Sequence, residues 1–446
     1  AGLAHLLAIS GLHMGLVVGA VFGAVRGGLA LVPALALRLP AKKIAAVVGM
    51  VAAAAYLGLS GGAVPTVRAF LMVMLVLAAI LLDRRAISLR TVALAALGIL
   101  AVQPEALLEA GFQMSFAAVV ALVAVYERWA ARTRRDRTRA AGGASRTAAY
   151  MAGVAATSLI AGLATAPFAI YHFDRLALLG LAANLVAVPV VALLVMPALV
   201  AGLLLELVGG GTLALQAAGF GISVVLRVAA LIAGLPGAEM IAARPPVWAL
   251  ASVVLGGLIL LLQTARTRWI GLAPLAAGIA AFIAASGPDL LADDIGATLA
   301  VRRAAEGTYA LHLARRSTFA AERWLRADGD ARPVSEARSA WTAACGQDPV
   351  CTTTLKGGFA ARIDLRSASR RAGAVRPDCT GVDILLVPRR DAACLSGSIL
   401  VIDRQWLRKH GATAVRIGDG GLSVATTSQA RGQRPWVPRA RLNSGG

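Results

Sequence analysis

The stretch LALLGLAANLVAVPVVALLVMPALVAGLLLEL, residues 176–207, contains one charged side chain, Glu206. Apolar runs longer than about 18 residues are typical of helices that cross a membrane, because a spanning helix needs about 20 apolar residues. Such runs recur along the chain, whose 446 residues are 58% hydrophobic and 15% charged. Since soluble domains are about 45–50% apolar, the sequence predicts a mainly α-helical membrane protein with several passes.

The apolar segments predict a polytopic transmembrane helical bundle of about ten segments. The segment 29–37 is too short to span a bilayer and is interpreted as re-entrant or interfacial. The chain begins at Ala1, inside an apolar segment and without a methionine, so we expect a fragment that lacks the N-terminal part. The segments lie near residues 1–24, 43–60, 64–82, 89–103, 106–126, 149–171, 176–207, 212–235, 247–264 and 270–286.

Lysine and arginine gather in alternate connections between these segments, as they do in loops that face the cytoplasm. The strongest marker is ERWAARTRRDRTRAAGGASR (127–146), with seven arginines against Glu127 and Asp136. This pattern predicts a multi-pass membrane protein whose C-terminal region lies on the periplasmic or outer face. The other basic residues on the same side are Arg38, Lys42, Lys43, Arg84, Arg85, Arg90, Arg266 and Arg268.

The formal net charge is +21, from 44 Lys and Arg against 23 Asp and Glu. Positive cytoplasmic loops account for much of this excess whatever the protein transports. The rest would attract an acidic polymer such as nucleic acid, or anionic lipid head groups. Charge alone therefore leaves both a topological and a binding role open.

The composition changes near Gly287, where charged residues become frequent and all four cysteines follow. We predict a transmembrane domain at 1–286, a small periplasmic α/β domain at 287–430 and a flexible tail at 431–446. Short alternating runs predict strands at 297–303, 308–313, 382–388 and 398–404, and FAAERWLRAD predicts a helix at 319–328.

The cysteines Cys345, Cys351, Cys379 and Cys394 all lie in the predicted outer domain. An even number of cysteines in an oxidising compartment suggests disulfides, most simply between neighbours in the sequence. A zinc site is the alternative, but there is no CxxC pair or histidine spacing to support it. The sequence indicates no cofactor.

The first segment, AGLAHLLAISGLHMGLVVGAVFGAV, is unusual because it places His5, Ser10 and His13 among apolar residues. Polar groups in hydrocarbon are costly and tend to face a cavity or a partner. His5 and His13 would meet only if the helix breaks between them, and Gly11 is a suitable break. The alternative is close helix packing at the glycines, with the histidines bonded to nearby backbone.

In LSGGAVPTVRAFLMVML, a glycine pair predicts a turn, Pro65 a helix start, and Arg68 lies one turn further. An arginine at this position is usually a snorkelling interface residue. The functional alternative is that Arg68 presents its guanidinium to phosphate at a pore mouth.

Two further segments carry polar residues or prolines. Gln113 and Ser115 lie in EAGFQMSFAAVVALV, where interhelical hydrogen bonding is the ordinary role. Asn184 and Pro189 lie in the long apolar run, which is further interrupted by Pro197. Repeated interruption favours a cavity over a rigid anchor, although prolines are common in membrane helices.

Taken in order, four stretches resemble the membrane core of the ComEC competence proteins, the DNA-uptake channels of bacterial transformation. The likeness covers residues 1 to about 286, and the remainder more loosely. The stretches are HLLAISGLHMGLV (5–17), GGAVPTVRAFLM (61–72), PEALLEAGFQMSFAAV (104–119), and TAPFAIYHF (165–173) with LLGLAANLVAVP (178–189).

The resemblance implies passage of single-stranded DNA through the inner membrane into the cytoplasm, and an extracytoplasmic OB-like domain upstream of this chain. It implies a DNA-delivering periplasmic receptor and a cytoplasmic helicase-like ATPase as partners, beside membrane lipid and further copies of the chain. The candidate channel residues that match the family stretches are His5, Ser10, Gly11, His13, Pro65, Arg68, Gln113, Ser115, Asn184 and Pro189.

Many ComEC proteins end in a metallo-β-lactamase-like domain with the metal motif HxHxDH. This chain has only His312 and His410 beyond residue 290, far apart and without adjoining His and Asp. The resemblance therefore implies a degenerate metallo-β-lactamase-like domain, and we predict no catalysis.

The leading hypothesis is a channel for uptake of single-stranded DNA. No GxxxxGK[ST] loop is present, so energy from ATP would have to come from a partner. The alternatives are a proton-coupled small-solute transporter, in which His5 and His13 relay protons, and a membrane-anchored nuclease.

Overall fold

The computed structural model describes residues 3, 11–84, 88–133, 146–314, 318–346, 348–365, 379–387, 399–418 and 420–432. The chain divides into two compact units. Unit 1 comprises Ala1–Met240 and Pro246–Ala281, and unit 2 comprises Ile241–Pro245 and Phe282–Gly446. The main part of unit 2 thus begins at Phe282, five residues before the change in composition near Gly287. Unit 2 also includes Ile241–Pro245, a segment that precedes α12 (Val247–Leu262) and α13 (Leu272–Ile283) in the chain.

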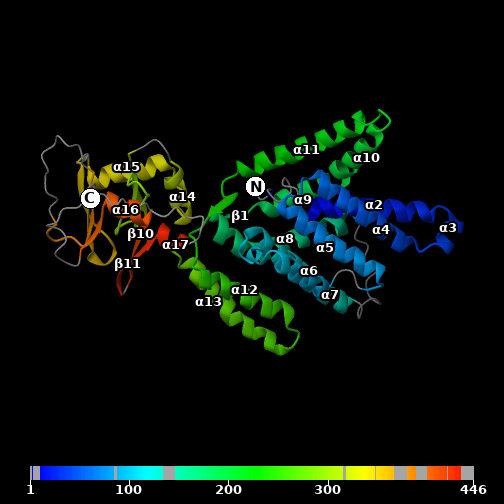
Figure 1. The fold of residues 1–446 in the computed structure, drawn as a ribbon, viewed down its shortest axis with the longest axis horizontal. Coiled ribbons are helices and arrows are strands. Elements are labelled where there is room, and N and C mark those ends of the chain that lie inside the picture. Colours follow the sequence, from blue (N-terminus) through cyan, green and yellow to red (C-terminus); the bar gives the residue numbers. More distant parts are fainter. Residues whose placement is uncertain are drawn as a thin grey trace, which may run out of the picture. The chain divides into compact units, whose positions relative to one another are not determined.

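Unit 1 is built from helices and one short β-ribbon, formed by β1 (Arg175–Ala177) and β2 (Glu239–Ile241) (Figure 1). Its helices are α2 (Gly11–Ala30), α3 (Pro33–Arg38), α4 (Ala41–Leu59), α5 (Val64–Leu81), α6 (Leu89–Val102), η1 (Pro104–Leu108), α7 (Ala110–Thr133), α8 (Arg146–Phe173), α9 (Gly180–Val190), η2 (Val191–Val195), α10 (Met196–Glu206), α11 (Thr212–Ala233), α12 (Val247–Leu262), η3 (Arg266–Gly271) and α13 (Leu272–Ile283).

Six helical stretches of the described chain are long and apolar enough to cross a membrane. They are His13–Ala30, Ala41–Leu59, Ala110–Ala131, Thr147–Phe173, Gly180–Glu206 and Thr212–Ala233. The expected count of about ten is not confirmed, because three further apolar helices have only 10–17 residues and α13 has 12. At about 1.5 Å per residue, such helices fall short of a hydrocarbon core of about 30 Å.

The described ends of the helices in unit 1 fall into two groups. At one end, Lys43 at the start of α4 forms an ion pair with Asp83 after α5, 2.7 Å apart. The side chain of Arg128, near the end of α7, donates to the carbonyl oxygens of Leu260 and Gln263 at the end of α12. The two strands of the β-ribbon follow the C-terminal ends of α8 and α11. Lys43 near the start of α4 and Arg128 near the end of α7 are thus held by side-chain contacts, and the topology that the charge pattern predicts stays a prediction.

Helices α12 and α13 pack closely at glycines. An added Cβ on Gly256 would lie 2.6 Å from the carbonyl oxygen of Gly271 and 2.6 Å from the amide nitrogen of Leu275. At Gly278, a Cβ would lie 2.6 Å from the Val253 side chain. Small residues allow membrane helices to approach closely, so the sequence of this helical pair fixes its packing.

Unit 2 contains two sheets that share a core. The first has the strand order β11-β10-β3-β4-β5 and the second β6-β7-β8-β9, in which β7, β8 and β9 are parallel. The strands are β3 (Leu290–Ala292), β4 (Thr298–Arg302), β5 (Tyr309–Leu313), β6 (Val350–Thr354), β7 (Ala360–Asp364), β8 (Ile384–Leu386), β9 (Leu400–Ile402), β10 (Thr413–Gly418) and β11 (Gly421–Thr426).

The core of unit 2 joins apolar side chains of both sheets, among them Leu290 and Val301 from the first and Ile363, Ile384 and Ile402 from the second. Helices α14 (Phe319–Ala327) and α15 (Val334–Cys345) pack against the other face of the first sheet. The remaining helices are η4 (Lys356–Gly358), α16 (Arg404–His410) and α17 (Thr427–Arg431). The predicted strands correspond to β4, β5, β8 and β9 and the predicted helix to α14, whereas residues 433–446 lie outside the described part.

A loop after α14 joins separate parts of unit 2. The backbone of Ala243, in the Ile241–Pro245 segment, forms an isolated β-bridge with Asp328. The Asp328 carboxylate accepts a hydrogen bond from the amide of Gly287 at 2.9 Å and forms an ion pair with Arg302. Asp328 therefore connects both chain segments that enter unit 2.

Candidate functional site

Arg68 is a charged residue buried within unit 1, with 8% of its surface exposed. The preceding turn contains Gly61 and Gly62 at φ angles of 70° and 66°, and Pro65 lies in the first turn of α5, as the sequence predicted. The helix therefore starts where proline and glycine place it, and it directs Arg68 against neighbouring helices instead of leaving it exposed.

The guanidinium of Arg68 lies beside the start of α7. Its Nη1 is 3.4 Å from Oε2 of Glu109, whose side chain is 49% exposed. Charge-assisted hydrogen bonds are usually about 2.7–2.9 Å long, so this is a loose pair. A Cβ on Gly111 would lie 2.5 Å from Nη2 of Arg68, which means that glycine is needed there for the guanidinium to lie against the α7 backbone.

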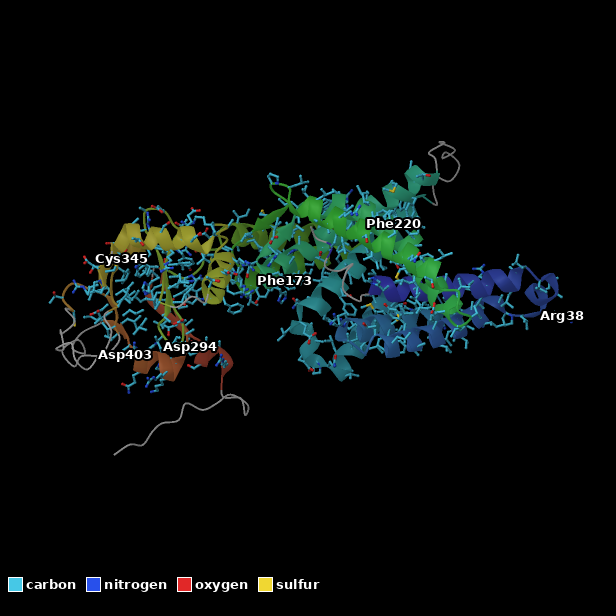
Figure 2. The ribbon with its side chains drawn as sticks, turned by 90° about the horizontal axis from the view of Figure 1, so that it is seen from above. Arg38, Phe173, Phe220, Asp294, Cys345 and Asp403 are labelled. Atoms are coloured by element: carbon cyan, nitrogen blue, oxygen red, sulfur yellow. A yellow bond between two sulfur atoms is a disulfide. The ribbon has the colours of Figure 1, made fainter. Side chains whose placement is uncertain are left out.

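Gln113, one turn along α7, joins η1 to the end of α8. Its Nε2 donates to the carbonyl oxygen of Leu107 at 2.9 Å. Its Oε1 lies 2.7 Å from Nε2 of His172, which makes the histidine the donor. His172 precedes Phe173, the residue labelled at the end of α8 in Figure 2. These side chains lie near the starts of α5 and α7 and the end of α8. We call the set the arginine cluster, which consists of Arg68, Glu109, Gln113 and His172.

The long apolar run forms a helix that changes its hydrogen-bonding pattern. Pro189 lies near the end of α9, and the π-helix η2 follows before α10 begins. A proline removes one backbone donor, and single π-helical turns are frequent at functional sites. The Oδ1 atom of Asn184 is buried with no hydrogen-bond partner among the described residues. Asn184 and Pro189 therefore mark an interrupted helix.

The remaining predicted channel residues are only partly placed. His5 and Ser10 lie outside the described residues. Gly11 opens α2, and a Cβ on it would lie 3.7 Å from that of Ala69, next to Arg68. His13 and Ser115 are half-buried on α2 and α7. The idea that His5 and His13 meet across a helix break at Gly11 stays a prediction.

Glu109 and His172 were not among the residues predicted from the sequence. Glu109 lies in the stretch PEALLEAGFQMSFAAV and His172 in TAPFAIYHF. Their place in stretches that resemble the family was the sequence feature from which they could have been selected. Their partners are 41 and 59 positions away in the chain, so the pairing depends on the fold.

In unit 2, Cys345 and Cys351 form the predicted disulfide. Cys379 is also disulfide-bonded, and its predicted partner Cys394 lies outside the described residues.

The two histidines of unit 2 stand apart. The His312 ring packs against Trp341 and the His410 ring against Trp406. Among the described residues, no group of three or more His, Cys, Asp or Glu side chains is arranged to hold a metal ion. The description of unit 2 as a degenerate metallo-β-lactamase-like domain stays a prediction.

Residues 1–267 match the family described as "Competence protein". The chain belongs to the competence protein family. It is also similar to the "ComE operon protein 3" of Bacillus subtilis (strain 168), with 28% identity over 208 residues. That alignment covers 46% of this chain and 23% of the relative, so the chain spans about a quarter of that protein. No solved structure matches the chain.

The family match confirms the resemblance predicted from the four stretches and supports a role in competence. It also includes the arginine cluster, which is built from residues of three of these stretches.

Proposed function

We propose that the chain conducts single-stranded DNA across the bacterial inner membrane. The observation that carries this proposal is the arginine cluster, in which a buried guanidinium meets polar side chains at the ends of apolar helices. Polar groups near a bilayer are costly, and they are usually retained to line a pathway or bind a ligand. A guanidinium is suited to phosphate because it forms two parallel hydrogen bonds with it.

In this proposal the chain crosses the membrane ten times, with α9, η2 and α10 forming one pass. The end that contains Lys43 and Arg128 faces the cytoplasm, because basic residues concentrate there. The arginine cluster then lies at the outer end of the bundle, where a strand enters. Unit 2 lies in the periplasm, where disulfides such as Cys345–Cys351 form and persist.

The strand arrives from a DNA-delivering periplasmic receptor and is drawn inward by a cytoplasmic helicase-like ATPase. The sequence has no phosphate-cradling GxxxxGK[ST] loop with which the chain itself would use ATP. Arg68 then exchanges its loose contact with Glu109 for successive phosphates. The long separation of 3.4 Å favours this exchange, since little is lost when the contact breaks.

The test replaces Arg68 with alanine or lysine in a full-length copy and measures entry of labelled DNA into cells. Arg68→Ala is expected to abolish uptake at normal protein level, and Arg68→Lys to retain part of it, because lysine keeps the charge without the planar fork. The matched control is Arg26→Ala, which removes an exposed arginine of α2. The Arg68→Ala protein should still fold, because Glu109 is half-exposed and is not left as a buried unpaired charge.

Normal DNA entry with Arg68→Ala at normal protein level would exclude Arg68 from the pathway. Proton-coupled uptake of a small solute, independent of DNA, would favour the transporter alternative. Metal-dependent hydrolysis of DNA by the purified full-length chain would favour the nuclease alternative.

A further inference from the structure

All four polar side chains of α11 lie on one side of the helix. In TLALQAAGFGISVVLRVAALIA they are Thr212, Gln216, Ser223 and Arg227. At about 100° per residue, they fall within an arc of about 60°. We call these four residues the polar stripe of α11.

The polar stripe is exposed, whereas the opposite face of α11 is packed. All four stripe residues are exposed. Phe220, which lies between Gln216 and Ser223 in the sequence and is labelled in Figure 2, is also exposed. On the other face Ala218, Gly221 and Val225 are buried. A Cβ on Gly221 would lie 2.6 Å from the Val195 side chain, so this contact fixes the rotation of α11 about its own axis.

This orientation is unusual for a helix that spans a membrane. Thr212–Ala233 is one of the stretches that are long and apolar enough to do so. Arginine is among the costliest residues to place in hydrocarbon, and polar groups there normally face a cavity or another protein. Arg227 has a long side chain that can reach the interface, and the Ser223 hydroxyl donates to the carbonyl oxygen of Gly219 within the helix at 3.0 Å. The Gln216 side chain is too short to reach the interface. Gln216, in the middle of the stripe, therefore needs a polar environment beside α11.

We propose that the polar stripe forms one wall of the path of the single-stranded nucleic acid, an inference that rests on the proposed function. Its ligand is the sugar–phosphate backbone. The Arg227 guanidinium binds phosphate, and the Gln216 amide donates hydrogen bonds to backbone oxygens. The eleven residue steps from Gln216 to Arg227 extend over about 16 Å, which is enough for several consecutive nucleotides.

Charge favours a strand over a second copy of the chain as the neighbour of the stripe. The helix contains Arg227 and no acidic residue. In a symmetric dimer formed through this face, the same patch meets itself, and Arg227 would approach Arg227. Like charges repel strongly in a medium of low dielectric constant. A strand instead supplies a phosphate with each nucleotide.

The test measures the reactivity of single cysteines in the full-length chain in membrane vesicles. Gln216→Cys and Ser223→Cys probe the stripe, and Ile222→Cys is the matched control, since Ile222 is exposed next to Ser223 but lies outside the arc. A charged maleimide that does not cross membranes is the reagent, and the unsubstituted chain gives the background. The stripe cysteines are expected to react faster than Ile222→Cys, and a single-stranded oligonucleotide should slow their reaction where inorganic phosphate does not.

A second measurement uses Arg227→Leu and Arg227→Lys. Loss of one charge-assisted contact is expected to weaken strand binding by about tenfold or more, and lysine should restore part of it. Unchanged binding in Arg227→Leu would overturn the assignment of phosphate to Arg227.

Three results of the cysteine experiment would also overturn the inference. They are equal reactivity of stripe and control cysteines, reaction without protection by the oligonucleotide, and disulfide formation between two copies at Ser223→Cys. Failure of the proposed function is seen separately. Inert stripe cysteines together with loss of uptake in Arg68→Ala would keep the conduit and remove α11 from its wall. Protected stripe cysteines with normal uptake in Arg68→Ala would keep α11 in the wall of the path and remove Arg68 from it.

Discussion

Replacing Gly256 with alanine is expected to force α12 and α13 apart. The new Cβ would lie 2.6 Å from the Gly271 carbonyl oxygen and 2.8 Å from the Leu275 Cβ, where ordinary contacts are 3.4–4 Å. The carbonyl oxygen and Cβ cannot rotate away, so the helices must separate by about 1 Å. Overpacking of this kind costs about 1–3 kcal/mol.

Gly257→Ala is the matched control for this prediction. It is the next residue of α12, and an added Cβ there meets nothing within 4 Å. Alanine favours a helix over glycine by up to about 1 kcal/mol at either position. Because this gain is common to both variants, the difference between them isolates the overpacking.

The assay is thermal denaturation of the purified full-length chain in detergent. Gly256→Ala is expected to be less stable than Gly257→Ala by about 1–3 kcal/mol. Equal stability of the two variants would refute the reasoning, since it would mean that α12 and α13 do not meet at Gly256.

Three further predictions concern unit 2 and use the full-length chain. Replacing Cys345 and Cys351 with serine should lower the stability of unit 2 by about 2 kcal/mol through the loss of loop-closure entropy. In denaturation scans, a reducing agent should lower the stability of the native chain more than that of this disulfide-free variant. Burial lowers the pKa of His312, so between that value and about 6.5 the unfolded chain binds more protons than the folded one. Stability should therefore fall as the pH drops below about 6.5, and His312→Gln should reduce this dependence in denaturation scans. Arg302→Ala leaves the buried Asp328 carboxylate unpaired and should cost about 3–5 kcal/mol. Since burial raises the pKa of Asp328, denaturation midpoints of this variant should recover partly in acid, whereas a loss independent of pH would contradict the assignment.

Composition and periodicity predicted the broad architecture of the chain. Long apolar runs identified the spanning helices, and alternating apolar residues identified strands such as β4 and β5. The predicted count of about ten spans was not confirmed, because α6 and α13 contain 14 and 12 residues and apolarity alone does not distinguish a short pass from a partial one. The strand order of the two sheets depends on pairing between distant segments, which a single sequence does not reveal.

The candidate site was predicted in part. Arg68 and Gln113 were selected because charged and polar residues are unusual in apolar helices. Their partners Glu109 and His172 were missed, since each pairing joins residues far apart in the chain. The burial of Arg68 was missed for the same reason, because an arginine one turn inside a helix is usually exposed at the interface.

The backbone bridge between Ala243 and Asp328 affects how unit 2 can be expressed by itself. A recombinant fragment that starts at residue 287 would omit Ile241–Pro245, and with it the backbone that bridges to Asp328. The carbonyl oxygen of Ala327 would then lose the hydrogen bond that it accepts from the amide of Arg244 at 3.0 Å. A circularly permuted gene, or the missing pentapeptide supplied on a short engineered linker, would restore these backbone contacts and is the better starting point for preparing this half of the protein.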